Sequence, residues 1–422
     1  MQPLVTIAKE AAERIKSESG LVHVVGHHDA DGICAASILA IALEKLGKPF
    51  QITITKDIKP ELIKQIADSK PSLVVFVDIG SGWLKDIAEL PCDVIVADHH
   101  DLTSVWVSTT HKLIHVNPML FGNIELAGAG VAYLIGREMV DDARLAQLAL
   151  VGSVGDCGDY SLELFVGPSV SRERGLNLFG RFSRPLYTAL ESAGFKNSIQ
   201  ILTEIKISPR KTLAELDDSE RQRLGDALVK ERLAADKNVA DLFTDVWTLA
   251  NRPKELTDAK EFATLLNAVG RMGSPTIGIA LCLGSPKALE DARAVSREYK
   301  RKLASALNWV ESNPAAIRRT EHAAYITAGS AINSTIIGTV VSILARSGDG
   351  RPLIGLADSD DGVKVSGRSA SKNMSKIIGR AAASVGGVSG GHEQAAGATI
   401  PAGSEKSFIE ECENSLSFQD LQ

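Results

Sequence analysis

The first half of the chain alternates short apolar runs with stretches of helical periodicity, and this alternation constrains the fold more than any other feature. Runs such as Leu73–Val77 (LVVFV) are continuous, which is typical of strands covered on both faces. The sequence therefore predicts a mostly parallel sheet between two layers of helix, an α/β fold. We expect strands over 21–26, 50–55, 73–77, 93–97 and 113–116, and helices over 1–20, 33–46, 60–69 and 83–90.

The second half differs from the first in its charge density and in the spacing of its apolar residues. From about Glu191 charged residues become dense and the apolar spacing turns helical, and the stretch between Pro286 and Pro314 contains neither Gly nor Pro. Short strands separated by glycine turns return from Ala323. We predict two α/β domains with an active-site cleft between them. The first is a parallel-sheet domain over 1–190, and a smaller domain over 316–422 follows a helical connector over 191–315.

Composition excludes several classes of function. The net charge of −6 excludes a basic field over the whole protein, so any nucleic acid would bind in a local groove or through metal ions. No apolar run reaches the length of a membrane span, and the N-terminus has no signal-peptide pattern. The five cysteines are scattered without a CxxC pair, which argues against a disulfide framework and a structural zinc site. We expect a cytoplasmic, nucleoid-associated protein with no membrane partner.

Histidines and aspartates follow four apolar runs directly. The fourth run, Leu145–Val154, is interpreted as one more strand. Because the carboxyl ends of parallel strands meet at one edge of a sheet, these side chains should converge. Carboxylates that converge repel one another unless cations neutralise them, and imidazoles add further ligands. The polar residues after the four runs are His27, His28, Asp29 and Asp31, then Asp78, then Asp98, His99 and His100, and last Asp156.

A metal site is weighed here against simpler roles. A single aspartate after a strand is usually a helix cap or a turn residue, and a pair of histidines is usually on the surface. Four such motifs at one predicted edge favour a metal site. The mixed nitrogen and oxygen ligands, without cysteine, suit Mn²⁺, with Mg²⁺, Co²⁺ or Zn²⁺ as substitutes. We expect His28 to be a loop residue that points away from this edge.

The four motifs resemble those of the DHH phosphoesterase family, and the spacing HxDxDG over 27–32 resembles its RecJ exonuclease branch. Further segments of the chain are similar to that branch: Val116-Asn117-Pro118, the AGAGVA run over 127–132 and the NAVGRM run over 267–272. The SGRS run over 366–369 and the GGH run over 390–392 resemble the DHH-associated domain. The compact form resembles archaeal RecJ-like proteins of the GINS-associated nuclease type.

The resemblance implies roles for individual residues. One ion would be held by His27 and Asp29, a second by Asp31, His99 and Asp156, and Asp78 would bridge them. Among the catalytic residues, Asp98 would support the neighbouring histidine and His100 would face the scissile phosphate. Arg368 and His392 would neutralise that phosphate from the second domain. The remaining residues expected to bind substrate are Asn267, Arg271, Ser366, Gly390 and Gly391.

The function that the resemblance implies is a metal-dependent exonuclease. It would hydrolyse single-stranded DNA, and RNA as a further substrate, through two Mn²⁺ ions that activate water, in DNA replication or repair. The segment 197–258 has no match in bacterial RecJ and is interpreted as a docking surface for GINS or replicative-helicase components. Two alternatives stay open: a phosphoesterase for nano-oligonucleotides, pAp or cyclic dinucleotides, and a non-catalytic replisome scaffold. A cluster of arginines after Asp156 (Arg172, Arg174, Arg181 and Arg184) is either a solvated face or a track for a single strand.

Overall fold

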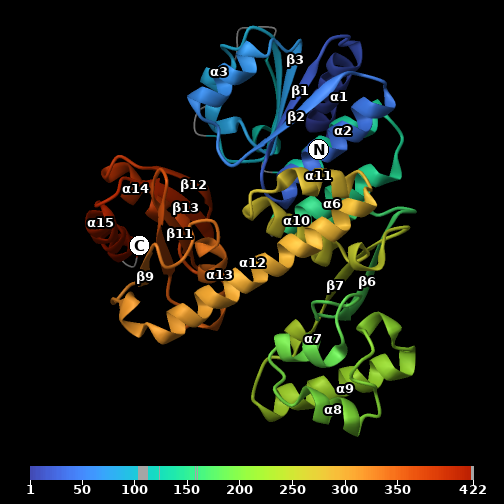
Figure 1. Cartoon of the computed structure of the whole chain (residues 1–422), viewed down its shortest axis with the longest axis vertical. Coiled ribbons are helices and arrows are strands. Elements are labelled where there is room, and N and C mark those ends of the chain that lie inside the picture. The colour runs from blue at the N-terminus through green and yellow to red at the C-terminus, as the bar shows by residue number, and fades with distance from the viewer. Residues whose placement is uncertain (103–112, 123, 157, 159, 420–422) are drawn as a thin grey trace. The chain divides into compact units, whose positions relative to one another are not determined.

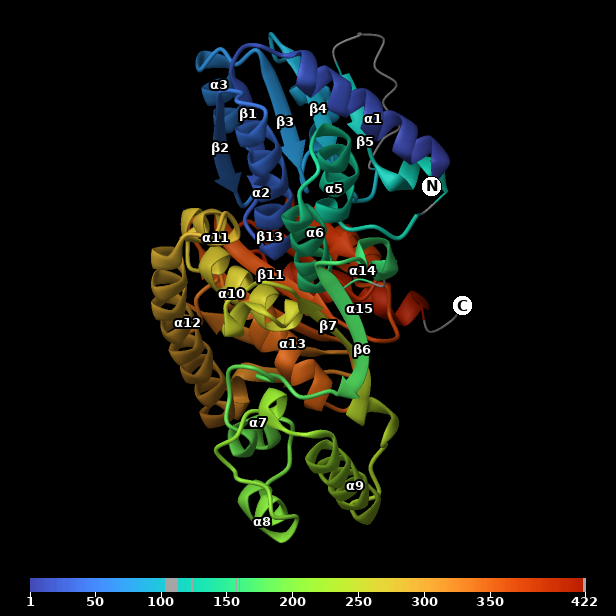
Figure 2. The ribbon, with the colours of Figure 1, turned by 90° about the vertical axis from the view of Figure 1, so that its right-hand side faces the viewer.

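Five parallel strands form the main sheet in the first part of the chain (Figure 1). Their order is β2-β1-β3-β4-β5 (Figure 2). This computed structural model describes residues 1–102, 113–122, 124–156, 158 and 160–419. The chain divides into two compact units, Met1–Arg293 and Ala294–Gln422. The strands of the main sheet are β1 (Val22–His27), β2 (Phe50–Thr55), β3 (Leu73–Val77), β4 (Asp93–Ala97) and β5 (Leu113–Val116), which confirms the strands predicted in this range.

Helices cover this sheet because its strands carry apolar side chains on both faces. Every side chain of β3 is buried. Phe76, Val74 and Val96 pack in one cluster with Ile66 and Ile87. These two residues come from α3 (Pro60–Asp68) and α4 (Leu84–Ile87). The helices that pack against one another elsewhere in this unit are α1 (Gln2–Ser17), α2 (Ala30–Lys45), α5 (Gly128–Met139) and α6 (Ala143–Asp156).

The prediction of a strand over Leu145–Val154 is wrong, since these residues lie in helix α6. This helix packs against α2, α5 and α10 (Ala259–Arg271), so it is apolar around most of its surface and loses the amphipathic period. A short apolar run does not distinguish a buried helix from a buried strand, and the alanines and glycines here are poor strand formers. Asp156 therefore comes from the end of a helix and not from a strand.

A helical subdomain lies within the first unit at the far end of a two-stranded antiparallel ribbon (Figure 2). The ribbon consists of β6 (Val170–Leu176) and β7 (Phe243–Leu249). The subdomain contains α7 (Leu186–Ser192), α8 (Ser198–Glu204) and α9 (Asp218–Ala234), and its leucines form a core of their own. The sequence predicts a helical connector over 191–315. This range also contains strand β7, which pairs with β6 in the preceding range. Its other helices are α10, α11 (Pro275–Cys282) and α12 (Pro286–Ser312).

The second unit is built on a six-stranded mixed sheet in the order β12-β13-β11-β10-β9-β8. Only β9 and β10 pair in parallel. Tyr325, Ile354, Val365 and Phe408 lie in its buried core. Its elements are β8 (Ile317–Arg319), β9 (Ala324–Gly329), α13 (Ile337–Ser347), β10 (Leu353–Ser359), β11 (Gly362–Arg368), α14 (Met374–Ser384), β12 (Val388–His392), β13 (Ala395–Ile400) and α15 (Glu405–Gln419).

Membrane-spanning helices were sought throughout the part of the chain that the structure describes. None of the helices there combines the length and the apolar character that a bilayer crossing requires.

Candidate metal centre

The candidate site lies at the carboxyl ends of β1, β3 and β4. The strand order places β1 between β2 and β3, so the connections leave this point in opposite directions, and ligands of open α/β sheets typically bind at the carboxyl edge of such a point. His27 is the last residue of β1, Asp78 follows β3, and Asp98–His100 follow β4. The sheet therefore delivers three of the four predicted motifs to one edge, while helix α6 delivers Asp156.

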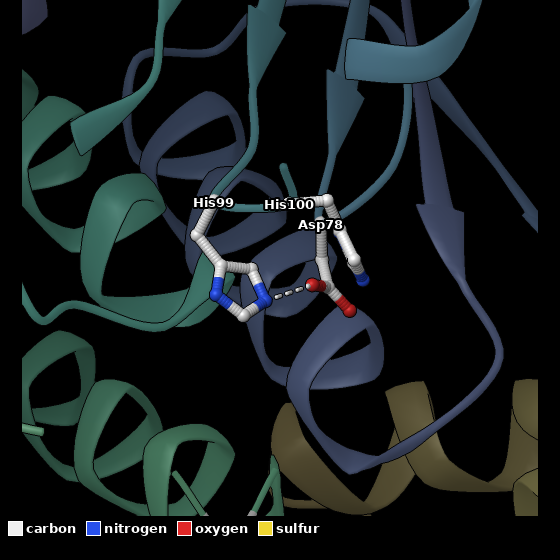
Figure 3. A group of neighbouring side chains, drawn as sticks. All are labelled: Asp78, His99 and His100. Carbon is white, nitrogen blue, oxygen red and sulfur yellow. Dashed lines mark ion pairs between the residues drawn. The ribbon is translucent and has the colours of Figure 1, made fainter. Parts of the chain in front are cut away.

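The structure brings all six predicted metal ligands together. Their ligand atoms fall into groups in which every pair lies within 4.8 Å. One group contains His27, Asp29 and Asp78, and another contains Asp31, His99 and Asp156. These are the two sets that the family resemblance implies for two ions. A third group joins Asp78 and His99 to His100 (Figure 3).

Asp78 connects the two groups through its two oxygens. Oδ2 lies 3.5 Å from His27 Nδ1, and Oδ1 lies 3.3 Å from His99 Nε2 (Figure 3). The residue has a φ of +56°, a left-handed conformation that Asp and Asn adopt more readily than other non-glycine residues. This backbone turn directly after β3 aims the carboxylate between the two histidines, which is the geometry of a bridging ligand.

Asp31 is fully buried at the N-terminus of α5. Its carboxylate accepts hydrogen bonds from the backbone N–H groups of Gly128 at 2.7 Å and Ala129 at 2.9 Å. Helix N-termini stabilise such charges. Burial, and next to it the charge of Asp78, nevertheless raise the pKa of Asp31 well above its usual range. The AGAGVA run thus orients a predicted ligand, a role that the sequence analysis did not assign.

Buried polar atoms in the centre favour a bound cation. His27 Nδ1 and Asp78 Oδ2 are buried and make no hydrogen bond to any residue that the structure describes. The two atoms lie 3.5 Å apart, and Asp29 Oδ2 lies 3.2 Å from the histidine nitrogen, so a cation among them would replace these long contacts with direct bonds. Imidazole nitrogens and carboxylate oxygens are also the ligands that Mn²⁺ accepts. The residues present therefore fit two divalent cations.

The buried Asp98 and the partly exposed His100 form a pair beside the ligands. Asp98 Oδ1 lies 2.7 Å from His100 Nδ1, and Asp98 Oδ2 accepts a hydrogen bond from the Ser81 N–H at 2.8 Å. Burial would lower the pKa of His100, but the charge of Asp98 and the hydrogen bond to it raise this pKa to about 10. His100 is therefore a cation at neutral pH. The side chain of Asp98 thus holds the ring of His100, whereas the histidine next to Asp98 in the chain is His99.

His28 contacts the centre, contrary to expectation. Its Nδ1 lies 3.0 Å from His27 Nε2, and the two rings meet edge to face at 4.5 Å. Burial, followed by the charge of His27, lowers the pKa of His28 to about 4, so its ring is neutral and able to accept a hydrogen bond. A histidine that binds a cation through Nδ1 carries its proton on Nε2, and a partner for that proton fixes the ring.

Tyr160 is a second residue that the sequence analysis missed. Its hydroxyl donates a hydrogen bond to Asp156, and its ring lies 6.0 Å from that of His99. Burial and the charge of Asp156 raise the pKa of the Tyr160 hydroxyl, which therefore keeps its proton and acts as a donor. Nothing in the sequence distinguishes this tyrosine from a core residue, because it belongs to none of the four motifs.

The residues expected to bind substrate are divided between the two units. Asn267 and Arg271 lie in α10, in the first unit. In the second unit, Arg368 and His392 both register with Ala395, in a row across β11, β13 and β12. A parallel row holds Ser366, Gly397 and Gly390. The residues of β13 between these positions, Ala395 and Gly397, are small. The roles of these residues stay predictions.

Two features fix the local geometry of Arg368 and Gly391. Arg368 is held by Ser342 Oγ at 2.9 Å and by the Gly367 carbonyl at 2.8 Å. Gly391 has a φ of +133°, and a Cβ there would lie 2.6 Å from the Ala395 carbonyl oxygen, so only glycine fits. The backbone turn after Gly390 therefore depends on this glycine, as the GGH signature predicts.

The arginines after Asp156 do not form a basic track. Arg172 pairs with Glu163 at 2.5 Å and with Asp245 at 2.6 Å. Arg181 is only 7% exposed and donates to the Leu176 carbonyl. These ion pairs and this burial stabilise the β6–β7 ribbon and its surroundings, which favours the simpler interpretation over contacts with a nucleic-acid strand.

Cation binding should depend steeply on pH. Burial alone would lower the pKa of His99 and that of His27. The hydrogen bond and charge of Asp78 nevertheless raise the pKa of His99 to about 9, and Asp29 and Asp78 raise the pKa of His27. Both rings hold protons at neutral pH and must lose them before they bind a cation. The Mn²⁺ affinity should therefore rise with pH up to about 9, by up to about tenfold per pH unit for each proton displaced. Calorimetric Mn²⁺ titrations in buffers of different ionisation enthalpy measure both quantities, and an affinity independent of pH would contradict this assignment.

Substitution of His28 should weaken the neighbouring cation site. His28→Ala removes the acceptor for the His27 Nε2 proton, and the loss of such a partner typically costs about 10–100-fold in metal affinity. His28→Asn places an oxygen close to the position of Nδ1 and should retain most of the affinity. Mn²⁺ titration of both variants tests this. Equal affinity of His28→Ala and the unchanged protein would show that His28 is only a loop residue.

The comparisons with known proteins agree with this geometry. Residues 21–153 match the DHH family, N-terminal domain, and residues 321–417 match the DHHA1 domain. An uncharacterized protein of Methanocaldococcus jannaschii is 26% identical over 96% of this chain and 95% of its own length. The single-stranded-DNA-specific exonuclease RecJ of Bacillus subtilis is 29% identical over 35% of this chain, but this match spans only 21% of RecJ.

Solved structures share the fold. RecJ of Thermus thermophilus in complex with Mn²⁺ aligns with a TM-score of 0.64 and 18% identity, over 98% of this chain and 55% of that one. CDC45 of Entamoeba histolytica aligns with a TM-score of 0.63 and 12% identity, over 98% of this chain and 99% of that one. With a parallel-sheet DHH domain and a separate DHHA1 domain, arranged along the chain as in RecJ, this protein is a RecJ-like member of the DHH family.

Proposed function

We propose that the protein is a metal-dependent exonuclease that hydrolyses phosphodiester bonds of single-stranded DNA, with RNA as a further substrate. The observation that carries this proposal is the pair of ligand groups joined by the Asp78 carboxylate. When bound there, two divalent cations lower the pKa of water and offset the charge of a phosphoryl group. The likeness to RecJ of Bacillus subtilis, whose name specifies single-stranded DNA, supports the choice of substrate.

His100 supplies a fixed positive charge beside the ligands. Its Nδ1 is held by Asp98, and we assign its Nε2–H to a phosphoryl oxygen of the substrate. Because the pKa of His100 is raised to about 10, the ring keeps both protons at neutral pH. A preorganised donor of this kind stabilises negative charge that develops in a transition state. We assign His100 the role of binding the scissile phosphate, with Asp98 orienting it.

The second unit supplies the other phosphate-binding residues. The guanidinium of Arg368 is preorganised by Ser342 and Gly367, so little side-chain entropy is lost when it binds an anion. Ser366 lies two residues earlier in the same strand and on the same face of the sheet. We assign Arg368, Ser366 and the Gly390–Gly391 turn to the phosphates of the substrate, together with His392.

Partners beyond the substrate are part of the proposal. The helical subdomain at the end of the β6–β7 ribbon has a core of its own and stands apart from the candidate centre within its unit (Figure 2). This arrangement fits a docking element for a replisome component such as GINS. The likeness in fold to CDC45 supports this idea only as an analogy of architecture.

Substrate length distinguishes the exonuclease from a small-substrate phosphoesterase. A site that tracks several phosphates of a single strand releases counterions, with a slope in log K of about −0.7 per phosphate against log salt. We therefore expect end-labelled long strands to be degraded stepwise with Mn²⁺, and to bind with a steep salt dependence when Ca²⁺ replaces Mn²⁺. Preferred hydrolysis of a dinucleotide, with a flat salt dependence, would favour the small-substrate function. Mn²⁺ binding without hydrolysis of either substrate would favour a scaffold.

A further inference from the structure

The side chain of Asn267 joins two segments that carry predicted metal ligands. Its Oδ1 accepts a hydrogen bond from the Ala30 N–H at 3.1 Å, and its Nδ2 donates to the Gly155 carbonyl at 3.2 Å. Ala30 lies between Asp29 and Asp31, and Gly155 directly precedes Asp156. One carboxamide thus bridges the start of α2 and the end of α6.

An amide side chain suits both of these contacts. Ala30 is the first residue of α2, and its N–H has no acceptor within that helix. Gly155 is next to the last residue of α6, where carbonyl groups lack donors within the helix. Asn carries a donor and an acceptor on the same rigid group, so it satisfies both helix ends at once.

The backbone packing around Asn267 leaves little freedom. A Cβ on Gly270, one turn later in α10, would lie 1.8 Å from the His28 carbonyl oxygen. A Cβ on Gly155 would lie 2.6 Å from the Ala30 Cβ and 3.3 Å from the Ala263 Cβ. Helix α10 therefore touches the loop after β1 while α6 touches the start of α2, and glycine is required at both contacts.

We propose that Asn267 is a positioning residue of the metal centre, which fixes the separation of the Asp29–Asp31 segment from Asp156. This inference rests on the proposed function and deepens it. Asp31 and Asp156 belong to one ligand group, so a cation can bind both only while their segments keep a fixed separation. The neutral Asn267 amide, a clamp between the two backbones, holds this separation without adding a charge. The role replaces the substrate contact expected for Asn267, because both polar ends of its side chain are engaged with the backbone.

Two substitutions test the clamp in the full-length protein. Asn267→Ala removes both hydrogen bonds and favours the helix, while Asn267→Leu preserves the branched shape of the side chain. For both variants we expect the Kd for Mn²⁺ to rise about 10–100-fold, as for other partners that orient metal ligands. Excess Mn²⁺ should restore most of kcat, and KM for the oligonucleotide at saturating Mn²⁺ should stay unchanged. Thr264→Ala, at an exposed position one turn earlier in α10, is the matched control.

The outcomes separate the clamp from other roles. Unchanged Mn²⁺ affinity with a raised KM would make Asn267 a substrate-binding residue and overturn the inference. A lowered melting temperature of the metal-free variants with unchanged Mn²⁺ affinity would reduce its role to general stability and overturn it as well. If the unsubstituted protein binds Mn²⁺ but hydrolyses neither long nor short substrates, the proposed function fails while the clamp still stands on the binding data.

Discussion

Asp78→Asn should abolish hydrolysis and greatly weaken the binding of both cations. The two Asp78 oxygens face His27 and His99, which belong to different ligand groups, so one substitution removes a ligand from each. Substitution of a residue that only orients a metal ligand typically lowers metal affinity or activity about 10–100-fold. Substitution of a ligand shared by two cations should cause a larger loss. We expect kcat to fall by more than about 100-fold at any Mn²⁺ concentration.

The choice of asparagine makes this test specific. Asn tolerates the left-handed backbone at position 78, whereas Ala would add strain to the loss of the ligand. Asp86→Asn in α4 makes the same charge change at an exposed position and should retain activity. Circular dichroism and melting temperature check that the fold persists. Retention of Mn²⁺-dependent hydrolysis by Asp78→Asn would remove the bridging role from Asp78.

Arg368→Ala should lower kcat/KM for an oligonucleotide by about 100-fold or more while Mn²⁺ binding is unaffected. The guanidinium would offset phosphate charge, and the loss of one such preorganised donor typically costs about 10²–10³-fold in rate. Because Arg368 belongs to the second unit, the result also tests whether hydrolysis uses a residue of that unit. Steady-state kinetics with a labelled strand provide the measurement.

A control in the same unit distinguishes this effect from a loss of stability. Arg380→Ala breaks an exposed ion pair with Glu411 at 2.7 Å, which should change stability by less than about 1 kcal/mol and leave kinetics intact. Arg368→Lys retains the charge but not the planar fork that Ser342 orients, so its activity should lie between those of Arg368→Ala and the unchanged protein. Full activity of Arg368→Ala would mean that hydrolysis does not use this residue of the second unit.

Strands buried on both faces were the most predictable part of the fold. The predicted ranges of β3 and β4 agree with the structure because their apolar runs end at aspartates, whereas β2 (FQITIT) was found through its alternation. The apolar run of α6 gave the wrong element, since burial on nearly all sides removes the helical period. The ribbon strands β6 and β7 carry many exposed polar residues (VSRERGL, FTDVWTL), and the sequence analysis assigned no strand to either.

The site was predictable where ligands follow strands, and less so where contacts are tertiary. Asp78 and His99 were found because strand ends meet at one edge of a parallel sheet. Other contacts do not follow from sequence spacing. The ring of His28 is oriented toward His27, and Tyr160 contacts Asp156. The amide of Asn267 connects two distant segments. Asn267 was found as part of the NAVGRM run, but the run did not reveal that its side chain contacts Ala30 and Gly155.

A crystal of the full-length protein soaked in Mn²⁺ tests the central claim most directly, through the anomalous scattering of the metal. We predict two anomalous peaks at the carboxyl edge of the main sheet. One should be bound by His27, Asp29 and Asp78, and the other by Asp31, His99, Asp156 and the same Asp78 carboxylate. The peaks should lie about 3.5–4 Å apart, as in two-metal phosphoesterases. Mn²⁺ bound only elsewhere on the protein, or a single ion held without Asp78, would contradict the two-cation centre proposed for this chain.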